Sequence, residues 1–311
     1  MDLFNSISMF KKISFLFYFI SCFSFGQQES YYSLYRYTLN VINPAYAGAE
    51  SSNSFSFTSR QQWSSVPDAP STLAFSYSSA RKNKVGLGIS VVSDKVFVEQ
   101  QTFAYVDFSY RLQTTESTQL FLGIKAGGNF YNADPTKLNT YTFSPDPLKQ
   151  PLSKFNPNVG VGAFLKGELF WMSLSIPRLF NVNRDQNLVF TAKDRVHSYL
   201  GGGMDLPMNS NLLLKPALML RKVNGLPMTT DLSMMFSWQN NLDVGLSYRT
   251  RGAISLLSLV SIGAFDIGYA YEVPTESSLS QLNLKVHEIV LRIRLGESNA
   301  AFEEETQEIV E

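Results

Sequence analysis

The chain has 311 residues, no net charge and few charged residues, and these features exclude several classes of protein. Charged residues make up 17% of the chain, below the usual quarter, whereas aromatic residues make up 14%. Without a basic surplus the chain has no means of displacing counterions from phosphates, so nucleic acid is excluded as a partner. The single cysteine is Cys22, and everything after it lacks disulfides and thiolate metal sites.

Residues 1–26 have the pattern of a secretory signal peptide. Two lysines precede an apolar run from Ile13 to Ile20, and small residues lead to Gln27. The run is too short to span a bilayer, so we expect export through the Sec pathway and cleavage after Gly26. Cys22 lacks the neighbours of a lipoprotein acceptor site, and we expect it to be removed with the signal peptide.

An aromatic segment follows the cleavage site. Residues Tyr31–Tyr37 lead into "NPAYAG" at 43–48, and their spacing predicts one or two helical turns that end before Pro44. We expect residues 27–49 to form a periplasmic N-terminal segment. Its aromatic side chains need a dry place, so the segment could plug the mouth of a structure built by the rest of the chain.

From about residue 50 apolar residues alternate with polar residues and glycine, which is the period of β-strands. In "LDVGLSYR", 242–249, four apolar side chains fall on one face, and Asp243, Gly245, Ser247 and Arg249 fall on the other. The alternation predicts about fourteen strands, near 50–62, 69–80, 84–94, 100–112, 118–132, 156–166, 169–177, 194–206, 211–222, 228–238, 241–250, 253–262, 264–273 and 284–295. The segment at 253–262 is apolar on both faces and is the most ambiguous of them.

The connections between these strands fall into two sets. Those after even-numbered strands are brief: 81–83, 113–117, 167–168, 207–210, 239–240 and Gly263. Those after odd-numbered strands are mostly longer: 63–68, 95–99, 133–155, 178–193, 223–227 and 274–283, with 251–252 as the exception. Bacterial outer-membrane barrels have short periplasmic turns and long outer loops, whereas a soluble sandwich has no reason to sort its loops.

The apolar faces need a partner that the chain does not supply. No amphipathic helices are predicted that could form a second layer, so lipid is the expected partner, and strands in lipid must close on themselves. The sequence therefore predicts an all-β fold, a transmembrane antiparallel up-and-down β-barrel of about 14 strands at 50–295 in the outer membrane. Residues 296–311 form an acidic C-terminal tail. Aromatic residues near strand ends are expected at the membrane interfaces: Trp63, Trp171, Trp238, Tyr248 and Tyr271.

The polar faces of these strands carry charges of both signs. We expect these side chains in the lumen: Lys125, Asp231, Asp243, Arg249, Asp266, Glu272, Glu288, Arg292 and Arg294. Mixed signs indicate internal ion pairs that brace the wall, so a plugged or protein-filled barrel is favoured over an open ion-selective pore.

No constellation of residues indicates catalysis. His197 and His287 belong to no nucleophile motif and are expected to be polar residues near strand ends. Asp134 and Asp185 lie on loops without a repeated calcium-binding pattern. The run Gly201–Gly203 lacks the lysine of a phosphate loop and indicates close backbone packing. We therefore expect no catalytic residues, no cofactor and no metal.

Taken in order, the motifs of the chain resemble the PorP/SprF family. They are "NPAYAG" at 43–48, "RQQW" at 60–63, "KVGLGISVVSDK" at 84–95, "FLGIKAGGNFYN" at 121–132, "FNPNVGVGAFL" at 155–165, "LSIPRLFN" at 174–181, "LKPALMLRKVNGLPMTTDL" at 214–232, "GLSYRT" at 245–250, "IGYAYEVP" at 267–274 and "HEIVLRI" at 287–293. The residues that carry the resemblance include Asn43, Pro44, Tyr46, Gly48, Arg60, Trp63, Tyr248, Arg249, His287 and Glu288. Glu272 stands where we expect an Asp, and the acidic tail departs from the family pattern.

The resemblance implies an outer-membrane barrel of the Bacteroidota type IX secretion system. Such a barrel is expected to bind a secreted or surface-anchored partner, an adhesin-like cargo protein with a type B C-terminal domain, and to help secrete or anchor it. Other components of the system, in the periplasm or the outer membrane, are possible further partners. The resemblance implies no catalysis.

Three functions from different classes remain open. The leading one is a non-enzymatic barrel whose outer loops bind the exported protein, with candidate contacts at Tyr141, Phe143, Leu148, Leu179 and Phe180. The alternative is an outer-membrane transporter for small molecules, including apolar ones, with residues 27–48 as a plug. The third is an outer-membrane enzyme that uses one of the two histidines.

Overall fold

The computed structural model describes residues 31–50, 52–64, 66–80, 84–137, 151–180, 195–250, 252–275 and 284–296. The chain divides after Tyr31 into two units, and the structure below is that of the unit beginning at Tyr32. The predicted signal peptide, the residues of the acidic tail after Gly296, and Tyr141, Phe143 and Leu148 lie outside the described residues.

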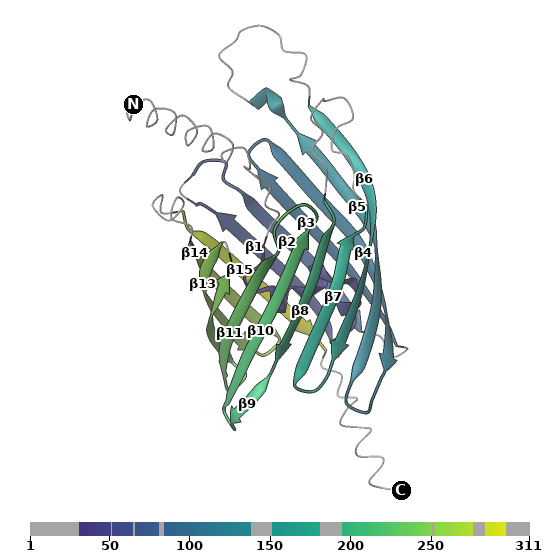
Figure 1. The fold of residues 1–311 in the computed structure, drawn as a ribbon, viewed down its shortest axis with the longest axis vertical. Coiled ribbons are helices and arrows are strands. Elements are labelled where there is room, and N and C mark those ends of the chain that lie inside the picture. The colour runs from purple at the N-terminus through teal and green to yellow at the C-terminus, as the bar shows by residue number, and fades with distance from the viewer. Residues whose placement is uncertain are drawn as a thin grey trace, which may run out of the picture. The chain divides into compact units, whose positions relative to one another are not determined.

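The strands form one antiparallel sheet that closes on itself (Figure 1). They are β1 (Asn53–Gln62), β2 (Ser71–Ala80), β3 (Val85–Val96), β4 (Glu99–Gln113), β5 (Gln119–Ala133), β6 (Leu152–Lys166), β7 (Phe170–Arg178), β8 (His197–Met204), β9 (Leu206–Asn209), β10 (Leu212–Val223), β11 (Thr229–Trp238), β12 (Leu242–Arg249), β13 (Ala253–Ile262), β14 (Phe265–Pro274) and β15 (Val286–Leu295). β8 and β9 are two parts of one wall position, interrupted at Asp205, because both pair with β10. The barrel therefore has 14 wall positions, as predicted.

The barrel closes where the first strand meets the last. β1 pairs with β15 from Asn53 opposite Leu295 to Gln62 opposite Val286. Every other strand pairs with its neighbour along the chain. This is the up-and-down topology that the alternation of the sequence predicts, and that prediction is confirmed.

Burial along each strand is the reverse of that in a water-soluble protein. In β12, Asp243, Ser247 and Arg249 are buried, whereas Leu246 is 57% exposed. The polar side chains thus face the interior of the barrel and the apolar side chains form its outer surface, which suits a wall with lipid around it. Among the described residues, no helix is long and apolar enough to cross a membrane.

The two rims of the barrel differ in their connections. The short-connection side is where β2 ends and β3 begins, and likewise for β4 and β5, β6 and β7, β9 and β10, β11 and β12, and β13 and β14; two to five residues of the sequence separate the strands of each pair. The long-connection side is where β1 ends and β2 begins, and likewise for β3 and β4, β5 and β6, β7 and β8, β10 and β11, β12 and β13, and β14 and β15; the separations there reach 18 residues of the sequence. The prediction for 95–99 was wrong: β3 and β4 continue to Val96 and from Glu99, and a tight turn at Phe97 and Val98 joins them. β6 also begins earlier than predicted, at Leu152, which shortens the connection before it.

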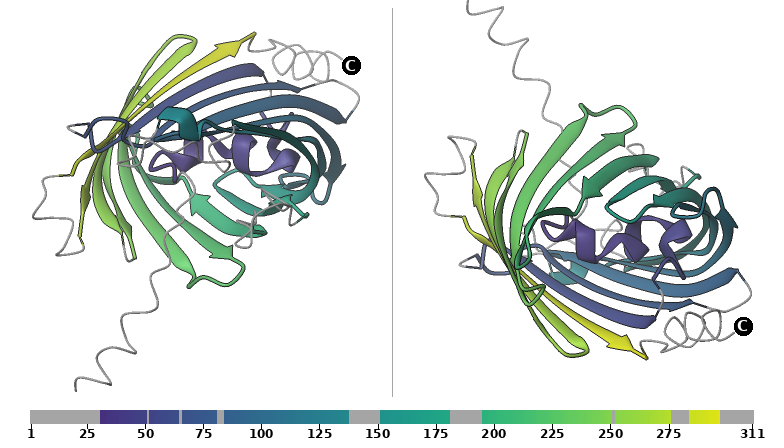
Figure 2. Two further views of the ribbon diagram at one scale, coloured as in Figure 1. Left: turned by 90° about the horizontal axis from the view of Figure 1, so that it is seen from above. Right: turned by 90° about the horizontal axis from the view of Figure 1, so that it is seen from below.

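Residues 32–50, here called the lumen segment, lie inside the ring of strands (Figure 2). The segment contains the 3₁₀ turn η1 (Tyr35–Tyr37), the short helix α2 (Leu39–Ile42) and the 3₁₀ turn η2 (Pro44–Tyr46). A further 3₁₀ turn, η3 (Pro135–Lys137), follows β5. α2 ends before Pro44 as predicted, because the residue that precedes a proline is disfavoured in helical conformation.

One predicted interfacial aromatic residue lies elsewhere. Trp171 shares the inner face of β7 with Ser173 and Ser175, and only 7% of it is exposed. It packs near the Phe164 ring, with centroids 6.2 Å apart. The prediction of an interfacial Trp171 was wrong because the interior of this barrel is filled with protein, which gives a large ring a dry place there.

Candidate functional site in the lumen

The "NPAYAG" stretch of the lumen segment rests on glycines of the barrel wall. A Cβ atom at Gly123 would lie 2.3 Å from the Ala45 nitrogen, and one at Gly86 would lie 2.1 Å from the Ala47 oxygen. Contacts this short do not occur, so only glycine allows the backbone of the segment to lie against β3 and β5. Gly48 adopts a φ of 72°, in the left-handed region that favours glycine.

Asn43 joins the lumen segment to two strands at once. Its Nδ2 donates to the Ala163 oxygen at 2.9 Å and lies 2.8 Å from the Ser173 hydroxyl oxygen. Its Oδ1 accepts from the Ala45 N–H at 2.9 Å, which caps the η2 turn. Asn43 is fully buried, so the loss of this side chain would leave wall groups without partners.

The carbonyl groups of the segment are satisfied by side chains of the wall. Lys125 Nζ donates to the Val41 oxygen at 2.9 Å, and Lys166 Nζ donates to the Ala49 oxygen at the same distance. Ser175 Oγ donates to the Ile42 oxygen at 3.1 Å, and Ser109 donates to the Ala47 oxygen. The polar inner face thus provides the hydrogen bonds that the short helices cannot make for themselves.

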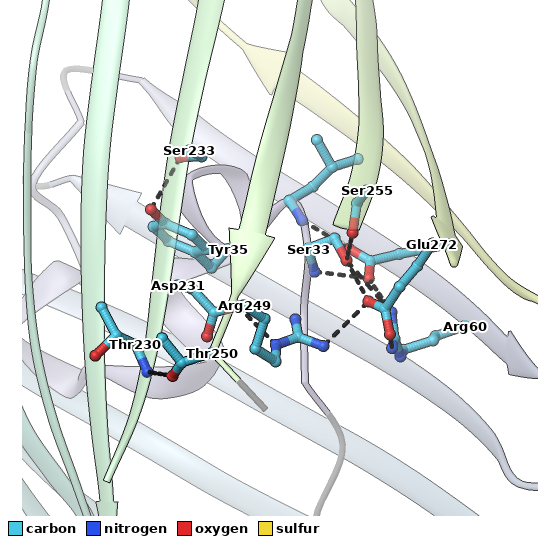
Figure 3. A network of polar contacts seen from close by, with 12 residues as sticks. Ser33, Tyr35, Arg60, Thr230, Asp231, Ser233, Arg249, Thr250, Ser255 and Glu272 are labelled. Carbon is cyan, nitrogen blue, oxygen red and sulfur yellow. Dashed lines mark hydrogen bonds and ion pairs between the residues drawn. The ribbon is translucent and has the colours of Figure 1, made fainter. Parts of the chain in front are cut away.

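Five charged residues of β1, β11, β12, β14 and β15 form a network beside the first residues of the lumen segment, and Figure 3 labels four of them, Arg60, Asp231, Arg249 and Glu272. We call it the ion network; its members are Arg60, Asp231, Arg249, Glu272 and Glu288. Arg60 lies 2.9 Å from Glu272 and 3.0 Å from Glu288. Arg249 lies 2.6 Å from Asp231 and 3.1 Å from Glu272.

The ion network also holds the backbone of the lumen segment. Glu288 accepts from the Ser33 N–H at 2.8 Å and from the Leu34 N–H at 3.0 Å, and the Ser33 hydroxyl donates to Glu272 at 3.0 Å. Two guanidinium groups face three carboxylates in the network, which leaves one negative charge over within this set. The two amides direct their partial positive charges at that excess, so the segment completes the network.

The direction of the lumen segment follows from these contacts. The ion network lies near the ends of β1 and β14 and the start of β15, toward the long-connection side. At the other end of the segment Glu50 pairs with Arg292 at 2.7 Å, near the short-connection side. The segment therefore crosses the lumen from the long-connection side to the short-connection side before β1 begins.

Glu50 closes the short-connection end of the lumen segment. Its burial alone would raise its pKa, but the Arg292 guanidinium and the hydrogen bond that Tyr46 Oη donates at 2.6 Å outweigh this and hold the pKa of Glu50 below its ordinary value. Arg292 also reaches Asp266 at 2.8 Å. The carboxylate is thus charged at neutral pH and fastens the segment to β15.

Apolar contacts complete the packing of the segment. One cluster joins Tyr35, Leu39 and Ile42 to wall residues that include Phe121 and Phe164. The second joins Leu34 to inner-face residues of β11, β13, β14 and β15, namely Met235, Leu257, Ala270 and Val290. β13 is apolar on both faces because its inner face packs against the lumen segment.

The remaining predicted charges also lie on the inner wall. Asp243 pairs with Lys215 at 2.9 Å and accepts from the Tyr37 hydroxyl at 2.5 Å. Lys125 lies 3.4 Å from Asp107, and Arg294 lies 3.0 Å from Asp266. These pairs stand beside the lumen segment and face it from several strands.

The other residues of the family pattern are not brought together. Tyr248 is 47% exposed on the outer face of β12, and His287 lies on the outer face of β15, 2.7 Å from the Tyr269 hydroxyl. Trp63 follows the last residue of β1 and donates its backbone N–H to the Lys285 oxygen at 2.8 Å. His197 is buried at the start of β8, 3.2 Å from Arg221. The two histidines therefore lie on strands that are not neighbours.

Several residues of the site carry no signal that the alternation of the strands could show. Phe121, Phe164, Met219 and Leu257 are apolar residues on the inner face, where a water-filled barrel would have polar ones. A usable signal was the set of glycines on the same face, Gly86, Gly123 and Gly162, since glycines in a strand mark the close approach of another backbone.

Two of the loop candidates are described, at the end of β7. Leu179 and Phe180 are exposed on the long-connection side, Phe180 by 54%. In the described part of the chain, no group of three or more histidine, cysteine or acidic residues is placed to hold a metal ion.

Comparison with solved structures returns outer-membrane proteins. The Ralstonia pickettii toluene transporter TbuX is 12% identical, with a TM-score of 0.45 over 82% of this chain and 92% of that one. The P. putida toluene transporter TodX is 9% identical, with a TM-score of 0.47 over 82% of this chain and 93% of that one. The Acinetobacter baumannii outer membrane protein Omp33 is 10% identical, with a TM-score of 0.44 over 80% and 100%.

No curated protein matches the chain. A family model does: the type IX secretion system membrane protein PorP/SprF matches residues 24–293. With a closed β-barrel whose apolar side chains face outward and a match over most of its length, this chain belongs to the PorP/SprF family of outer-membrane proteins of type IX secretion.

Proposed function

We propose that this protein is a non-enzymatic docking barrel, which binds an exported protein on its long-connection side and helps to secrete or anchor it at the cell surface. The observation that supports this function is the filled lumen. Residues 32–50 occupy the interior, and their backbone is bonded to Lys125, Lys166, Ser175 and Glu288 of the wall. A barrel whose interior holds a segment bonded to the wall in this way is suited to present surfaces rather than to conduct solutes.

In this proposal the long-connection side faces outward and meets the partner. Leu179 and Phe180 are neighbouring apolar side chains that are exposed at the end of β7, as expected of residues that dock a partner. The partner is expected to be a surface protein with a type B C-terminal domain, as in the family.

Binding of that domain tests the proposal. The purified barrel, in nanodiscs, is titrated with the C-terminal domain of the exported protein encoded next to its gene. Leu179→Ser combined with Phe180→Ser should weaken binding roughly 30-fold or more, because interface anchors contribute about 1 kcal/mol or more each and the two together about 2 kcal/mol or more. The matched control is Leu169→Ser on the short-connection side, where Leu169 is 47% exposed; this variant should bind like the native protein.

Two results would count against docking. One is a native barrel that does not bind the domain; the other is a cell that lacks the gene and still displays its neighbouring surface protein normally. Steady conductance or solute uptake by the native barrel in liposomes would instead support transport of small molecules. The filled lumen predicts an electrically silent protein.

A further inference from the structure

Among the described residues, the edge of β6 that faces β7 is paired over only part of its length, and the unpaired part is here called the open edge. β6 pairs with β5 along its whole length, from Leu152 opposite Ala133 to Lys166 opposite Gln119. It pairs with β7 only from Val161 to Lys166. In the part of the chain that the structure describes, no strand lies beside residues 152–157 on the β7 side.

The chain after β7 is turned away from this edge. Leu179 donates its N–H to the Val159 oxygen at 2.9 Å, which is the next possible rung of a ladder. Beyond this bond, the Asn158 side chain replaces the backbone of β6 as the hydrogen-bond partner of the chain. Its Oδ1 accepts from the N–H groups of Leu179 and Phe180 at 3.0 Å, and its Nδ2 donates to the Phe180 oxygen at 2.9 Å. A side chain thus satisfies the backbone groups that would otherwise have continued the ladder along β6.

The direction of the free groups follows from the same rung. The Val159 carbonyl faces β7, and backbone groups of a strand alternate in direction, so those of Pro157, Phe155 and Ser153 face the open edge. The rings of Phe155 and Phe130 lie 4.6 Å apart across the β5 pair, as expected where two residues exchange no backbone hydrogen bonds. Pro157 has no N–H, so Phe155 and Ser153 supply the donors of this edge.

The open edge lies past the part of β6 that must cross the bilayer. A tilted strand needs about 9–11 residues to span the membrane. β6 has 15 residues. Counted from Lys166 on the short-connection side, Leu152–Phe155 lie beyond the hydrocarbon region on the long-connection side, where unpaired backbone groups can bind water.

We propose that this edge binds an extended segment of the exported protein as an added β-strand. The inference rests on the proposed docking function and names the place and the manner of binding. Backbone donors and acceptors in a row, with which no described residue pairs, can recognise another extended backbone, whatever its sequence. The side chains beside the edge set its pattern: Phe155 is 50% exposed and faces outward, whereas Asn156 is buried and faces inward, so the added strand alternates apolar and polar residues.

The donor at Phe155 allows a matched test. Phe155→Pro removes the N–H that faces the open edge and leaves the β5 ladder intact, as Pro157 already does two residues away. Phe155→Ala removes the ring and keeps the N–H. The probe is the C-terminal domain of the exported protein, titrated against barrels in nanodiscs that keep the heat-resistant mobility of the native protein on gels.

Strand addition predicts that Phe155→Pro weakens binding about tenfold or more, whereas Phe155→Ala weakens it by less than about threefold. Amide exchange of residues 152–156 should slow when the domain binds. Equal binding by the native and Phe155→Pro barrels, or binding without slower exchange at 152–156, would overturn the inference while docking itself stands. Failure of the native barrel to bind the domain would instead refute the proposed function, and the inference with it.

Discussion

Gly123→Ala should release the lumen segment from its seat on β5. The new Cβ would lie 2.3 Å from the Ala45 nitrogen and 2.5 Å from its Cα, against ordinary contacts of 3.4 Å or more, so Ala45 must move by about 1 Å. This overpacking costs about 1–3 kcal/mol, and a shift of that size also weakens the hydrogen bonds of the adjacent Asn43, each worth about 1 kcal/mol. The sum, about 3 kcal/mol, corresponds to a rise of roughly 100-fold in the population of the unseated segment.

Cysteine labelling measures this population. Thr38→Cys places a buried thiol in the segment, and the native Cys22 lies in the predicted signal peptide. When opening is fast relative to labelling, the labelling rate follows the open population, so Gly123→Ala should raise it roughly 100-fold. Gly202→Ala is the control, because its Cβ would meet no atom nearer than 3.2 Å. Equal labelling rates in the Gly123→Ala and control backgrounds would refute the argument that the wall glycines seat the segment.

Three further predictions follow from the wall. Glu288→Ala leaves Arg60 buried without this partner and should destabilise the barrel by about 3–5 kcal/mol, as measured in urea titrations followed by gel mobility. Combining Arg60→Ala with Glu288→Ala should recover part of this loss. If the two single effects simply add in the double variant, the pairing is contradicted. Leu246→Arg places a charge on the outer face in the middle of β12 and should cost about 2–4 kcal/mol, seen as less folded barrel in membranes, while Leu246→Phe should fold normally. The pKa of Glu50 is lowered in the folded protein, so its contribution to the stability of the seated lumen segment is present above the unfolded-state pKa and is lost as the pH falls below about 4. Labelling at Thr38→Cys should therefore become faster in acid. In the Thr38→Cys background, Glu50→Gln should make labelling fast at neutral pH and remove the part of the pH dependence that Glu50 causes.

The barrel could be predicted from the sequence because the two faces of each strand meet different surroundings, lipid on one side and a polar interior on the other. Apolar Leu246 lies on the outer face, which meets lipid, whereas charged Asp243 lies on the inner face, which is polar. Each strand repeats this contrast. The turn at Phe97 could not be predicted in the same way. Phe97 adopts a φ of 55°, which an aromatic residue rarely does, and neither glycine nor asparagine marks the turn.

The interior was harder to predict because alternation reports only that two faces differ. It did not show that a segment of the same chain would fill the lumen and dry part of the inner face. Trp171 and Leu257 are therefore buried at positions where alternation alone predicts water or an interface. Four charges of the ion network, Asp231, Arg249, Glu272 and Glu288, were predicted to face the lumen, whereas Arg60 was not. Their pairing could not be predicted, because Arg60 and Glu288 are separated by most of the chain and meet only through closure of the sheet.

The seam between β1 and β15 ties biogenesis of the wall to filling of the lumen. Arg60 and Glu288 stand directly opposite each other across that seam, and Glu288 also binds the Ser33 and Leu34 amides. The first strand follows the lumen segment in the chain, and the last strand brings the carboxylate that secures it. Closure of the sheet and retention of the lumen segment therefore depend on the same carboxylate, so a copy with a paired seam also has this end of the lumen segment bound.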